Sequence, residues 1–369
     1  MSEWREVSLD SVAQINPTES LSKGTVAKKI AMDALQPFTK KPSSYELEAY
    51  NGGIKFKNGD TIVARITPCL ENGKTAYIDV LEENEVAYGS TEYIVLREKF
   101  GVTDKQFLYY FSISPIFRDV AIASMTGSSG RQRVQTDVVK QHVFEMPSLK
   151  EQKAIASVLS SLDDKIDLLH RQNTTLERMA ETLFRQWFVE EAQEDWDVVP
   201  FGELFEISSG KGLKKEQLSD TGLYPVLGAN GEIGRTNDFL FNEKLIFTGR
   251  VGTLGNIFRV NNEKVWLSDN TLIFRNIKYF YFVYFALNNA GLSDYNVGST
   301  QPLVRQSDIK AIEILMPNNH EYLNRFEAEA ELIFSKINSN DKQIQTLEKL
   351  RDNLLPKLMS GEVRVDLAS

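Results

Sequence analysis

Few side chains in this chain have the types and spacing that catalysis requires. Gly73-Lys74-Thr75 resembles the end of a phosphate-binding loop, but Pro68 stands where that loop needs a glycine. Asp60, Glu71 and Lys74 together suggest a nuclease site. The spacing from Glu71 to Lys74 is one residue too long for such a site, and Glu71-Asn72-Gly73-Lys74 has the composition of a turn. We therefore expect no catalytic residue.

Metal and cofactor chemistry also lack their usual residues. Cys69 is the single cysteine, and the three histidines, His142, His170 and His320, share no ligand spacing. No Gly-x-Gly-x-x-Gly motif is present for a dinucleotide or an adenosyl group. The sequence predicts no metal site and no cofactor bound by this chain.

Composition is that of a globular protein of about two domains. The chain has 369 residues, of which 42% are hydrophobic and 25% charged. Its longest apolar runs are far shorter than the roughly 20 residues that cross a bilayer. We expect a soluble, cytoplasmic protein without membrane contact. The net charge of −9 is uneven: segments 149–195 and 321–369 together carry −6, and the remaining segments carry −3. Nearly neutral domains can still present a basic face, so a nucleic-acid partner remains open.

The positions of apolar and polar residues indicate an internal repeat. Trp4-x-x-Val7-x-Leu9-x-x-Val12-x-x-Ile15 recurs 192 residues later as Trp196-x-x-Val199-x-Phe201-x-x-Leu204-x-x-Ile207. The other matches occur in the same order in both halves: Ile62 to Ile66 with Phe247 to Val251, Ser90 to Arg97 with Ser268 to Arg275, Gly127-Ser128-Ser129 with Gly298-Ser299-Thr300, and Met146-Pro147 with Met316-Pro317. Short β-branched runs broken by Gly, Asn and Asp predict strands and turns within each copy.

A long heptad pattern follows each Met-Pro dipeptide. Steps of 3.5 residues sustained over more than four heptads indicate a coiled coil, and the alternative is a helix that packs only on its own domain. The two apolar seams share one register at an offset of 171: Ile155, Leu159, Leu162, Ile166, Leu169, Asn173, Leu176, Ala180, Leu183 and Trp187 in the first, and Phe326, Ala330, Ile333, Ile337, Asn340, Ile344, Leu347, Arg351, Leu354 and Leu358 in the second.

Asn173 and Asn340 decide the direction of pairing. In a parallel pair each would face an apolar residue, whereas in a symmetric antiparallel pair the two asparagines face each other. When the two side-chain amides bond to each other, each avoids a desolvation cost of about 1–3 kcal/mol. We therefore predict that Asn173 and Asn340 set the register of an antiparallel coiled coil. The expected fold is α+β, with two similar α/β domains separated by two long helices.

This arrangement resembles the specificity (S, or HsdS) subunits of type I restriction–modification enzymes, over essentially the whole chain. The resemblance is carried by the Trp-x-x-Val-x-Leu opening, Gly59 to Arg65, Gly89 to Tyr93, Glu151 to Ala156 and Leu354 to Glu362. The start of the second helix, Asn318 to Tyr322, and the seam residue Arg351 depart from the first copy.

The resemblance implies a DNA-recognition subunit without a catalytic site. Residues 1–148 and 191–318 would be target-recognition domains, each reading one half of a bipartite, asymmetric site in double-stranded DNA. Residues 149–190 and 319–369 would be the spacer helices, the second with a C-terminal tail, and would dock two methyltransferase (M) subunits and, through them, restriction (R) subunits. S-adenosylmethionine, ATP and magnesium would be bound by those partners. The seam from Ile155 to Trp187 would be about 48 Å long, roughly 14 base pairs of DNA.

Candidate DNA contacts are side chains that can reach phosphates or base edges. The predicted set is Arg65, Lys74, Ser128, Ser129, Arg131, Gln132 and Arg133 in the first half, and Lys211, Lys214, Lys215, Asn230, Arg250, Ser299, Thr300 and Gln301 in the second. For each of them the alternative is a solvated surface side chain.

Two other functions fit less well. The acidic total also suits a protein-only scaffold whose domains bind peptides, and a divergent methyltransferase or nuclease would need the motifs that are missing. The same acidity leads us to expect that the isolated chain binds DNA weakly and gains affinity from basic partners.

Overall fold

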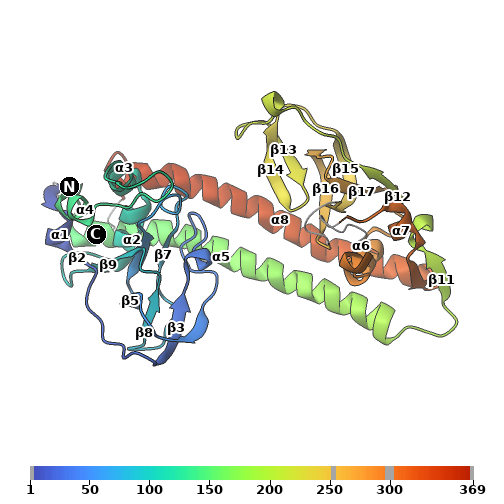
Figure 1. Ribbon diagram of the computed structural model, residues 1–369, viewed down its shortest axis with the longest axis horizontal. Helices are drawn as coiled ribbons and strands as arrows, with labels where there is room; N and C mark the ends of the chain where they lie inside the picture. Colours follow the sequence, from blue (N-terminus) through green and yellow to red (C-terminus); the bar gives the residue numbers. More distant parts are fainter. Residues whose placement is uncertain (1–3, 251–254, 296–302, 366–369) are drawn as a thin grey trace. The chain divides into compact units, whose positions relative to one another are not determined.

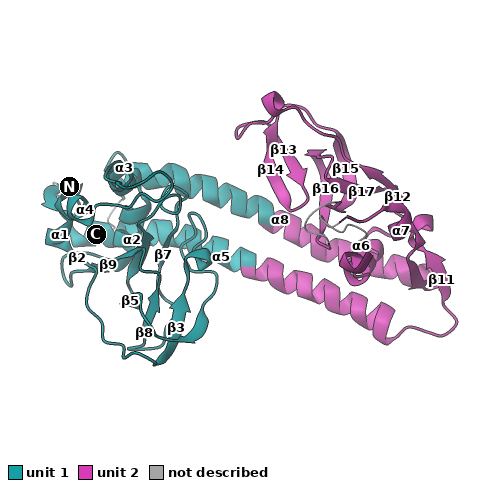
Figure 2. Cartoon of the chain, in the orientation of Figure 1, with its two compact units in different colours: residues 1–170, 341–369 teal, residues 171–340 magenta. Residues whose placement is uncertain are grey.

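The computed structural model describes residues 4–250, 255–295 and 303–365. The chain forms two compact units, residues 1–170 with 341–369 (unit 1) and residues 171–340 (unit 2) (Figure 2). The division passes through two long helices, α5 (Leu149–Arg185) and α8 (His320–Met359). Each unit therefore combines one globular segment with half of each long helix.

Unit 1 contains ten short strands and three helices of its own within its described residues (Figure 1). The strands are β1 (Arg5–Ser8), β2 (Ala13–Ile15), β3 (Val26–Ile30), β4 (Glu46–Ala49), β5 (Ile54–Lys57), β6 (Thr61–Ala64), β7 (Thr75–Tyr77), β8 (Val86–Gly89), β9 (Tyr93–Glu98) and β10 (Val143–Met146). The helices are α2 (Lys105–Ile113), α3 (Pro115–Ala123) and α4 (Thr136–Gln141), besides the single turn α1 (Leu9–Val12).

Unit 2 repeats this order with longer strands. Its strands are β11 (Asp197–Pro200), β12 (Glu206–Ser209), β13 (Tyr224–Gly228), β14 (Gly231–Thr236), β15 (Phe241–Gly249), β16 (Ile257–Leu267), β17 (Thr271–Arg275) and β18 (Glu313–Met316). Its helices are α6 (Phe280–Asn289) and α7 (Gln306–Ala311).

The strand pairing confirms the predicted repeat. The four-stranded order β2-β9-β6-β7 of unit 1 returns in unit 2 as β12-β17-β15-β16. A two-stranded antiparallel pair joins the opening of each copy to its Met-Pro end, β1 with β10 and β11 with β18. Each copy also has one parallel pair, β3 with β8 and β13 with β16. Long β16 fills the places of both β7 and β8, so unit 2 has one six-stranded sheet where unit 1 has two four-stranded sheets.

The long helices begin directly after the two Met-Pro dipeptides, as predicted. Pro147 precedes α5, and the Ser148 hydroxyl accepts a hydrogen bond from the Glu151 backbone N–H at 3.3 Å, which caps the first turn. The amide of Asn319 caps α8 in the same way, accepting from the Glu321 N–H at 2.9 Å.

Within each unit the halves of α5 and α8 pack against each other in antiparallel register. In unit 1, Ile166 and Leu169 form an apolar cluster with Ile344 and Leu347. In unit 2, Nδ2 of Asn340 donates to Oδ1 of Asn173 at 2.8 Å. The predicted antiparallel pairing and the predicted meeting of the two amides are both confirmed.

The buried face of each helix widens where a globular segment covers it. In unit 2, Phe184 of α5 and Phe188 of the π-helical turn that follows it (Gln186–Glu190) are buried beside the seam and contact Phe282 of α6, with ring centroids 5.9 and 4.8 Å apart. In unit 1, Leu355 and Met359 of α8 are buried in the same core as Phe107 of α2. Burying each such side chain contributes roughly 1.5–3 kcal/mol, so these positions join each globular segment to its helices.

Replacing one seam asparagine should destabilise the chain more than replacing both. Asn340→Leu removes the hydrogen bond that Oδ1 of buried Asn173 accepts across the seam, at a cost of about 1–3 kcal/mol, while Asn173→Leu/Asn340→Leu restores an apolar seam. Urea denaturation of both variants measures the difference, with exposed Asn353→Leu on the same helix as the control. Equal losses of stability in the single and double variants would contradict the prediction that the two amides stabilise each other.

Candidate nucleic-acid interface

Arg65 and Arg250 occupy equivalent positions in the two units. Each follows the central strand of its sheet, β6 or β15. The Arg65 backbone N–H donates to the Glu92 carbonyl at 2.9 Å, and the Arg250 N–H donates to the Asn270 carbonyl at 2.8 Å. Their own carbonyls accept from the N–H groups of Val134 at 2.9 Å and Val304 at 3.3 Å. The backbone therefore presents an arginine at the same point of both copies.

The two arginine side chains are held differently. Arg65 is half-buried: its Nη2 donates to the Val134 carbonyl at 3.2 Å, and its buried Nε has no acceptor among the described residues. Arg250 is exposed, and its Nη1 lies 3.5 Å from the Ser209 hydroxyl. Arg250 can thus reach a phosphate by moving its side chain alone.

Residues 126–133 of unit 1 form a loop whose tip is exposed. The N–H and C=O groups of Thr126 and Arg133 pair at 3.1 and 2.9 Å and close the loop. Between them Ser128, Ser129 and Arg131 are exposed, and Gln132 is half-buried. Arg131 makes no ion pair with the described residues, so its guanidinium remains available to a ligand.

The guanidinium of Arg133 is already engaged. Its Nε and Nη2 form three hydrogen bonds of 2.7–3.0 Å with both carboxylate oxygens of Glu92. The hydrogen bond from Arg133 holds the pKa of Glu92 below its ordinary value, and Glu92 raises the pKa of Arg133. This pair is a charge-assisted fork at the base of the loop.

Lys74 also has a partner within the fold. Its ammonium donates to the Met32 carbonyl at 2.9 Å, and the side chain is half-buried. Asp60 is fully buried, and its two oxygens accept from Nε and Nη2 of Arg97 at 2.6 and 2.7 Å. Lys74 and Asp60 therefore serve different local contacts, and both have structural roles there.

In unit 2 the predicted lysines lie on the loop that follows β12. Lys211, Lys214 and Lys215 are exposed and make no ion pair with the described residues. Gly210 permits this loop, because a Cβ there would lie 2.1 Å from the Ser268 carbonyl oxygen. The Lys211 carbonyl accepts from the indole N–H of Trp266 at 2.8 Å, which holds the loop against β16.

The remaining unit 2 candidates are only partly described. Asn230 is exposed in the two-residue turn between β13 and β14. Ser299, Thr300 and Gln301 lie outside the described residues. Contact with DNA remains a prediction for every residue of the proposed set.

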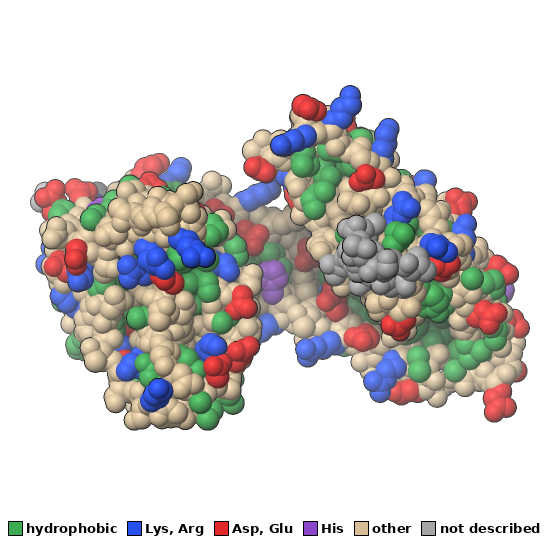
Figure 3. Space-filling model, in the orientation of Figure 1, with side chains coloured by type: hydrophobic (Ala, Val, Ile, Leu, Met, Phe, Trp, Pro, Cys, Tyr) green, Lys and Arg blue, Asp and Glu red, His purple; other side chains and the backbone are tan. Residues whose placement is uncertain are grey.

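Two residues that the sequence did not single out join these groups. The Ser209 hydroxyl lies 3.5 Å from Arg250 and accepts from Nε2 of Gln306 at 3.1 Å, beside the lysine loop. Glu92 holds Arg133 in unit 1. Glu92 belongs to the Ser90 to Arg97 run that matches the second copy, but the sequence does not show that Arg133 lies beside it. On the faces drawn in Figure 3, Lys and Arg side chains are interspersed with acids on both units.

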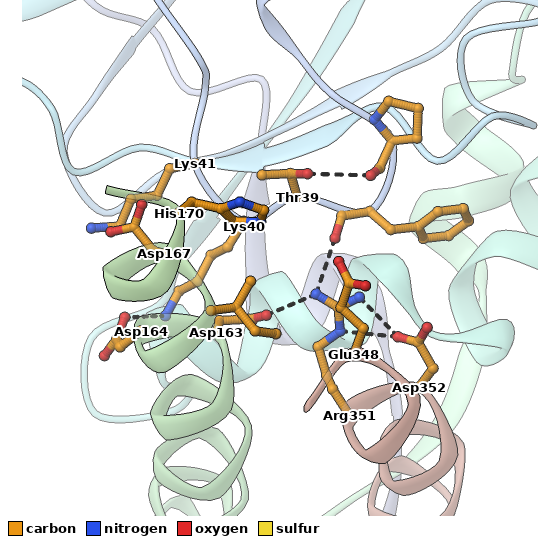
Figure 4. Close-up of a pocket in the computed structure, with 13 residues that line it drawn as sticks. Thr39, Lys40, Lys41, Asp163, Asp164, Asp167, His170, Glu348, Arg351 and Asp352 are labelled. Atoms are coloured by element: carbon orange, nitrogen blue, oxygen red, sulfur yellow. Dashed lines mark hydrogen bonds and ion pairs between the residues drawn. The ribbon is translucent and has the colours of Figure 1, made fainter. Parts of the chain in front are cut away.

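A charged cavity of about 300 Å³ in unit 1 is lined by residues 37–41 and by α5 and α8 (Figure 4). Arg351 lies on its wall, 8% exposed, with Nη1 2.9 Å from Oδ1 of Asp163 and 3.2 Å from the Phe38 carbonyl. The Tyr110 hydroxyl donates to the other oxygen of Asp163 at 2.6 Å. Arg351, which interrupts the apolar seam, thus joins a satisfied polar cluster.

The neighbouring carboxylates keep Arg351 charged despite its burial. Burial alone would lower the pKa of Arg351, but the hydrogen bond and charge of Asp163 raise it above its ordinary value. Burial lowers the pKa of Lys40 nearby, whose ammonium lies 3.2 Å from the Ser160 hydroxyl and 3.8 Å from Asp164. Among the described residues no group of three or more His, Cys, Asp or Glu side chains is placed to hold a metal ion.

Comparison with known protein families identifies the chain. The model of the type I restriction modification DNA specificity domain matches residues 1–178 and again residues 193–355. The chain belongs to this family. As a type I restriction–modification specificity subunit, its role is the recognition of DNA sequence.

Similar curated proteins carry the same description. The chain is 28% identical over 316 residues to the type I restriction enzyme MjaIX specificity subunit of Methanocaldococcus jannaschii, covering 73% of this chain and 71% of that protein. It is 31% identical over 208 residues to the EcoAI specificity subunit of Escherichia coli, covering 52% of this chain and 35% of that protein.

A solved structure shares the fold. The type I restriction–modification S subunit from M. genitalium superposes with a TM-score of 0.59 at 18% identity, covering 99% of this chain and 97% of that one. In the described part of the chain, no helix combines the length and apolarity needed to cross a membrane.

Removing Asp163 should destabilise unit 1 strongly. Asp163→Ala removes the buried carboxylate that pairs with Arg351 and accepts from Tyr110, so Arg351 is left with the exposed Asp352 as its ion-pair partner, and we expect stability to fall by about 3 kcal/mol, the low end for a broken buried pair. The double variant Asp163→Leu/Arg351→Leu should lose much less stability, because neither charge remains buried. Urea denaturation measures both. Asp137→Ala, whose side chain is 87% exposed beside Lys140, is the matched control and should change stability by under about 0.5 kcal/mol.

Proposed function

We propose that this specificity subunit reads a bipartite, asymmetric site in double-stranded DNA, one half with each unit. The observation that carries the proposal is the duplicated topology, in which two sheets of one strand order end in different loops. The same backbone position holds Arg65 in one unit and Arg250 in the other, while the loop after the first sheet strand carries Lys211, Lys214 and Lys215 in unit 2 and the single lysine Lys23 in unit 1. Different loops on a common scaffold suit two different half-sites.

The long helices would set the distance between the half-sites. Helix α5 has 37 residues, which at 1.5 Å per residue is about 55 Å. An unbroken helix is a suitable spacer, because its length is fixed by the number of its residues, whereas the span of a loop changes with its conformation. We further propose that α5 and α8 dock two methyltransferase subunits, which in turn hold restriction subunits.

Chemistry in the assembled enzyme would belong to those partners. S-adenosylmethionine would be bound by the methyltransferase subunits, and ATP and magnesium by the restriction subunits. In the described residues Asp60 and Asp163 each pair with an arginine, and the Lys74 ammonium donates to the Met32 carbonyl. This chain would contribute sequence recognition and geometry.

Binding to duplexes with altered spacers tests the bipartite reading. Methylome sequencing of a host that carries the gene with its methyltransferase neighbours gives the target. The reconstituted complex should then bind that duplex far more tightly than duplexes in which either half is scrambled or the spacer is changed by two base pairs. Indifference to spacer length would contradict the helical spacer. A peptide-binding scaffold would show no dependence on either half-site.

Arg131 should contribute a phosphate contact. Arg131→Ala should weaken binding of the reconstituted complex and reduce the slope of log K against log salt by about 0.9, because one fewer counterion is released. In unit 2, alanine at exposed Lys211, Lys214 or Lys215 should likewise weaken binding and reduce the salt slope. Lys140→Ala, on α4 and paired with Asp137, is the control. A salt slope equal to that of wild type would exclude a phosphate contact by Arg131.

A further inference from the structure

The backbone of the 126–133 loop is fixed only at its base. Beyond the Thr126–Arg133 pair, the Thr67 N–H donates to the Gln132 carbonyl at 3.0 Å, and Val134 is bonded to Arg65. Within the tip, the Arg131 N–H donates to the Ser128 carbonyl at 3.0 Å. These bonds define where the loop starts and ends, but leave its exposed tip to be oriented by side chains.

Glu92 supplies a rigid support for that purpose. It precedes β9, its N–H donates to the Ser90 hydroxyl at 3.1 Å, and its carbonyl accepts from the Arg65 N–H at 2.9 Å. A carboxylate fixed at its backbone in this way can orient a partner. The two parallel bonds, from Nε to Oε2 and from Nη2 to Oε1, restrain Arg133 in direction as well as in distance.

Stability alone does not account for the fork. The side chains of Glu92 and Arg133 are 23% and 47% exposed, and exposed pairs contribute little to folding. A bare carboxylate beside a DNA-contacting loop would also repel phosphates. Arg133 neutralises Glu92, so the pair can lie at the interface without that repulsion.

We propose that Glu92 is a positioning residue that acts through Arg133 to orient the 127–131 tip toward the first half-site. The inference rests on the proposed function and changes the role of Arg133 from a phosphate contact to a structural support of the loop. Ser128, Ser129 and Arg131 are then the side chains that meet DNA.

Unit 2 does not repeat this device in sequence. Asn270 stands at the position of Glu92, since its carbonyl receives the Arg250 N–H. Val304 corresponds to Val134 because each donates to the equivalent arginine carbonyl, so Leu303 stands at the position of Arg133. An amide and an apolar side chain cannot form a charged fork. The effect of Glu92 is therefore confined to the first half-site, and the second half-site serves as an internal control.

A charge exchange separates positioning from direct contact. Glu92→Gln and Arg133→Gln should each weaken binding to the full site about tenfold, the scale of a lost charge-assisted hydrogen bond, with no change in salt slope. Glu92→Arg/Arg133→Glu should recover most of that loss, because the fork is restored with its ends exchanged. Binding is measured with the reconstituted complex on duplexes altered in one half at a time. When the first half is already scrambled, the variants should bind as tightly as wild type.

Three outcomes would overturn the inference. A salt slope lowered by about 0.9 in Arg133→Gln with no recovery in the exchange variant would mean that Arg133 contacts phosphate directly. Tighter binding by Glu92→Gln would mean that the carboxylate only repels DNA. Binding by Glu92→Gln equal to that of wild type would mean that the Glu92 carboxylate has no role in recognition.

Two controls make these outcomes clear. Asp137→Asn breaks the exposed Asp137–Lys140 pair of the same unit and should leave binding unchanged. Thermal unfolding of each variant close to that of wild type excludes misfolding. If the proposed function itself fails, wild type shows no half-site dependence; if only this inference fails, wild type reads both halves and the variants follow one of the three outcomes above.

Discussion

The buried amides of Asn173 and Asn340 have to meet across an antiparallel seam, and the rest of the fold depends on this constraint. Asn173 and Asn340 satisfy it with each other, which fixes the register in which α5 and α8 can pack. A shift of one heptad would place both amides against apolar residues. The same register brings Ile166 and Leu169 to Ile344 and Leu347 in unit 1. Each globular segment then packs on a helix face whose position is already determined.

The two copies differ where their globular segments meet the helices. Asp163 is the fifteenth residue of α5 and Phe334 the fifteenth of α8, while Arg351 and Ala180 are the thirty-second residues of α8 and α5. The ion pair of unit 1 is thus replaced in unit 2 by a large and a small apolar residue, both buried. If α5 paired with a second α5, Asp163 would face Ala180; if α8 paired with α8, Arg351 would face Phe334. Either arrangement separates Asp163 from Arg351 and so breaks a buried ion pair, and the difference between the copies therefore favours pairing of α5 with α8.

Periodicity explains why the sequence predicted the helices and missed the polar contacts beside them. The seam repeats every 3.5 residues, so its members, its direction and the meeting of Asn173 with Asn340 could be worked out without coordinates. Arg351 stood out as a departure, but its partner Asp163 lies next to the seam residue Leu162 and has no periodic signal. Glu92 and Arg133 are 41 residues apart in segments that are neither helical nor alternating. Only the pairing of β6 with β9 and the closure of the 126–133 loop bring them together. The contact of the Lys74 ammonium with the Met32 carbonyl had no signal in the sequence either, because the two residues are far apart along the chain.

Backbone and side chains have separate tasks in the two recognition surfaces. Main-chain hydrogen bonds place Arg65 and Arg250 identically, and these bonds are independent of side-chain identity. The loops around them can therefore change in sequence without disturbing the sheet beneath. Unit 1 orients its loop with a charged fork, and unit 2 holds its lysine loop through the Trp266 indole and the close approach that Gly210 allows. A duplicated scaffold that tolerates different loop supports can present a different surface in each unit, which is the property that recognition of an asymmetric DNA sequence would require.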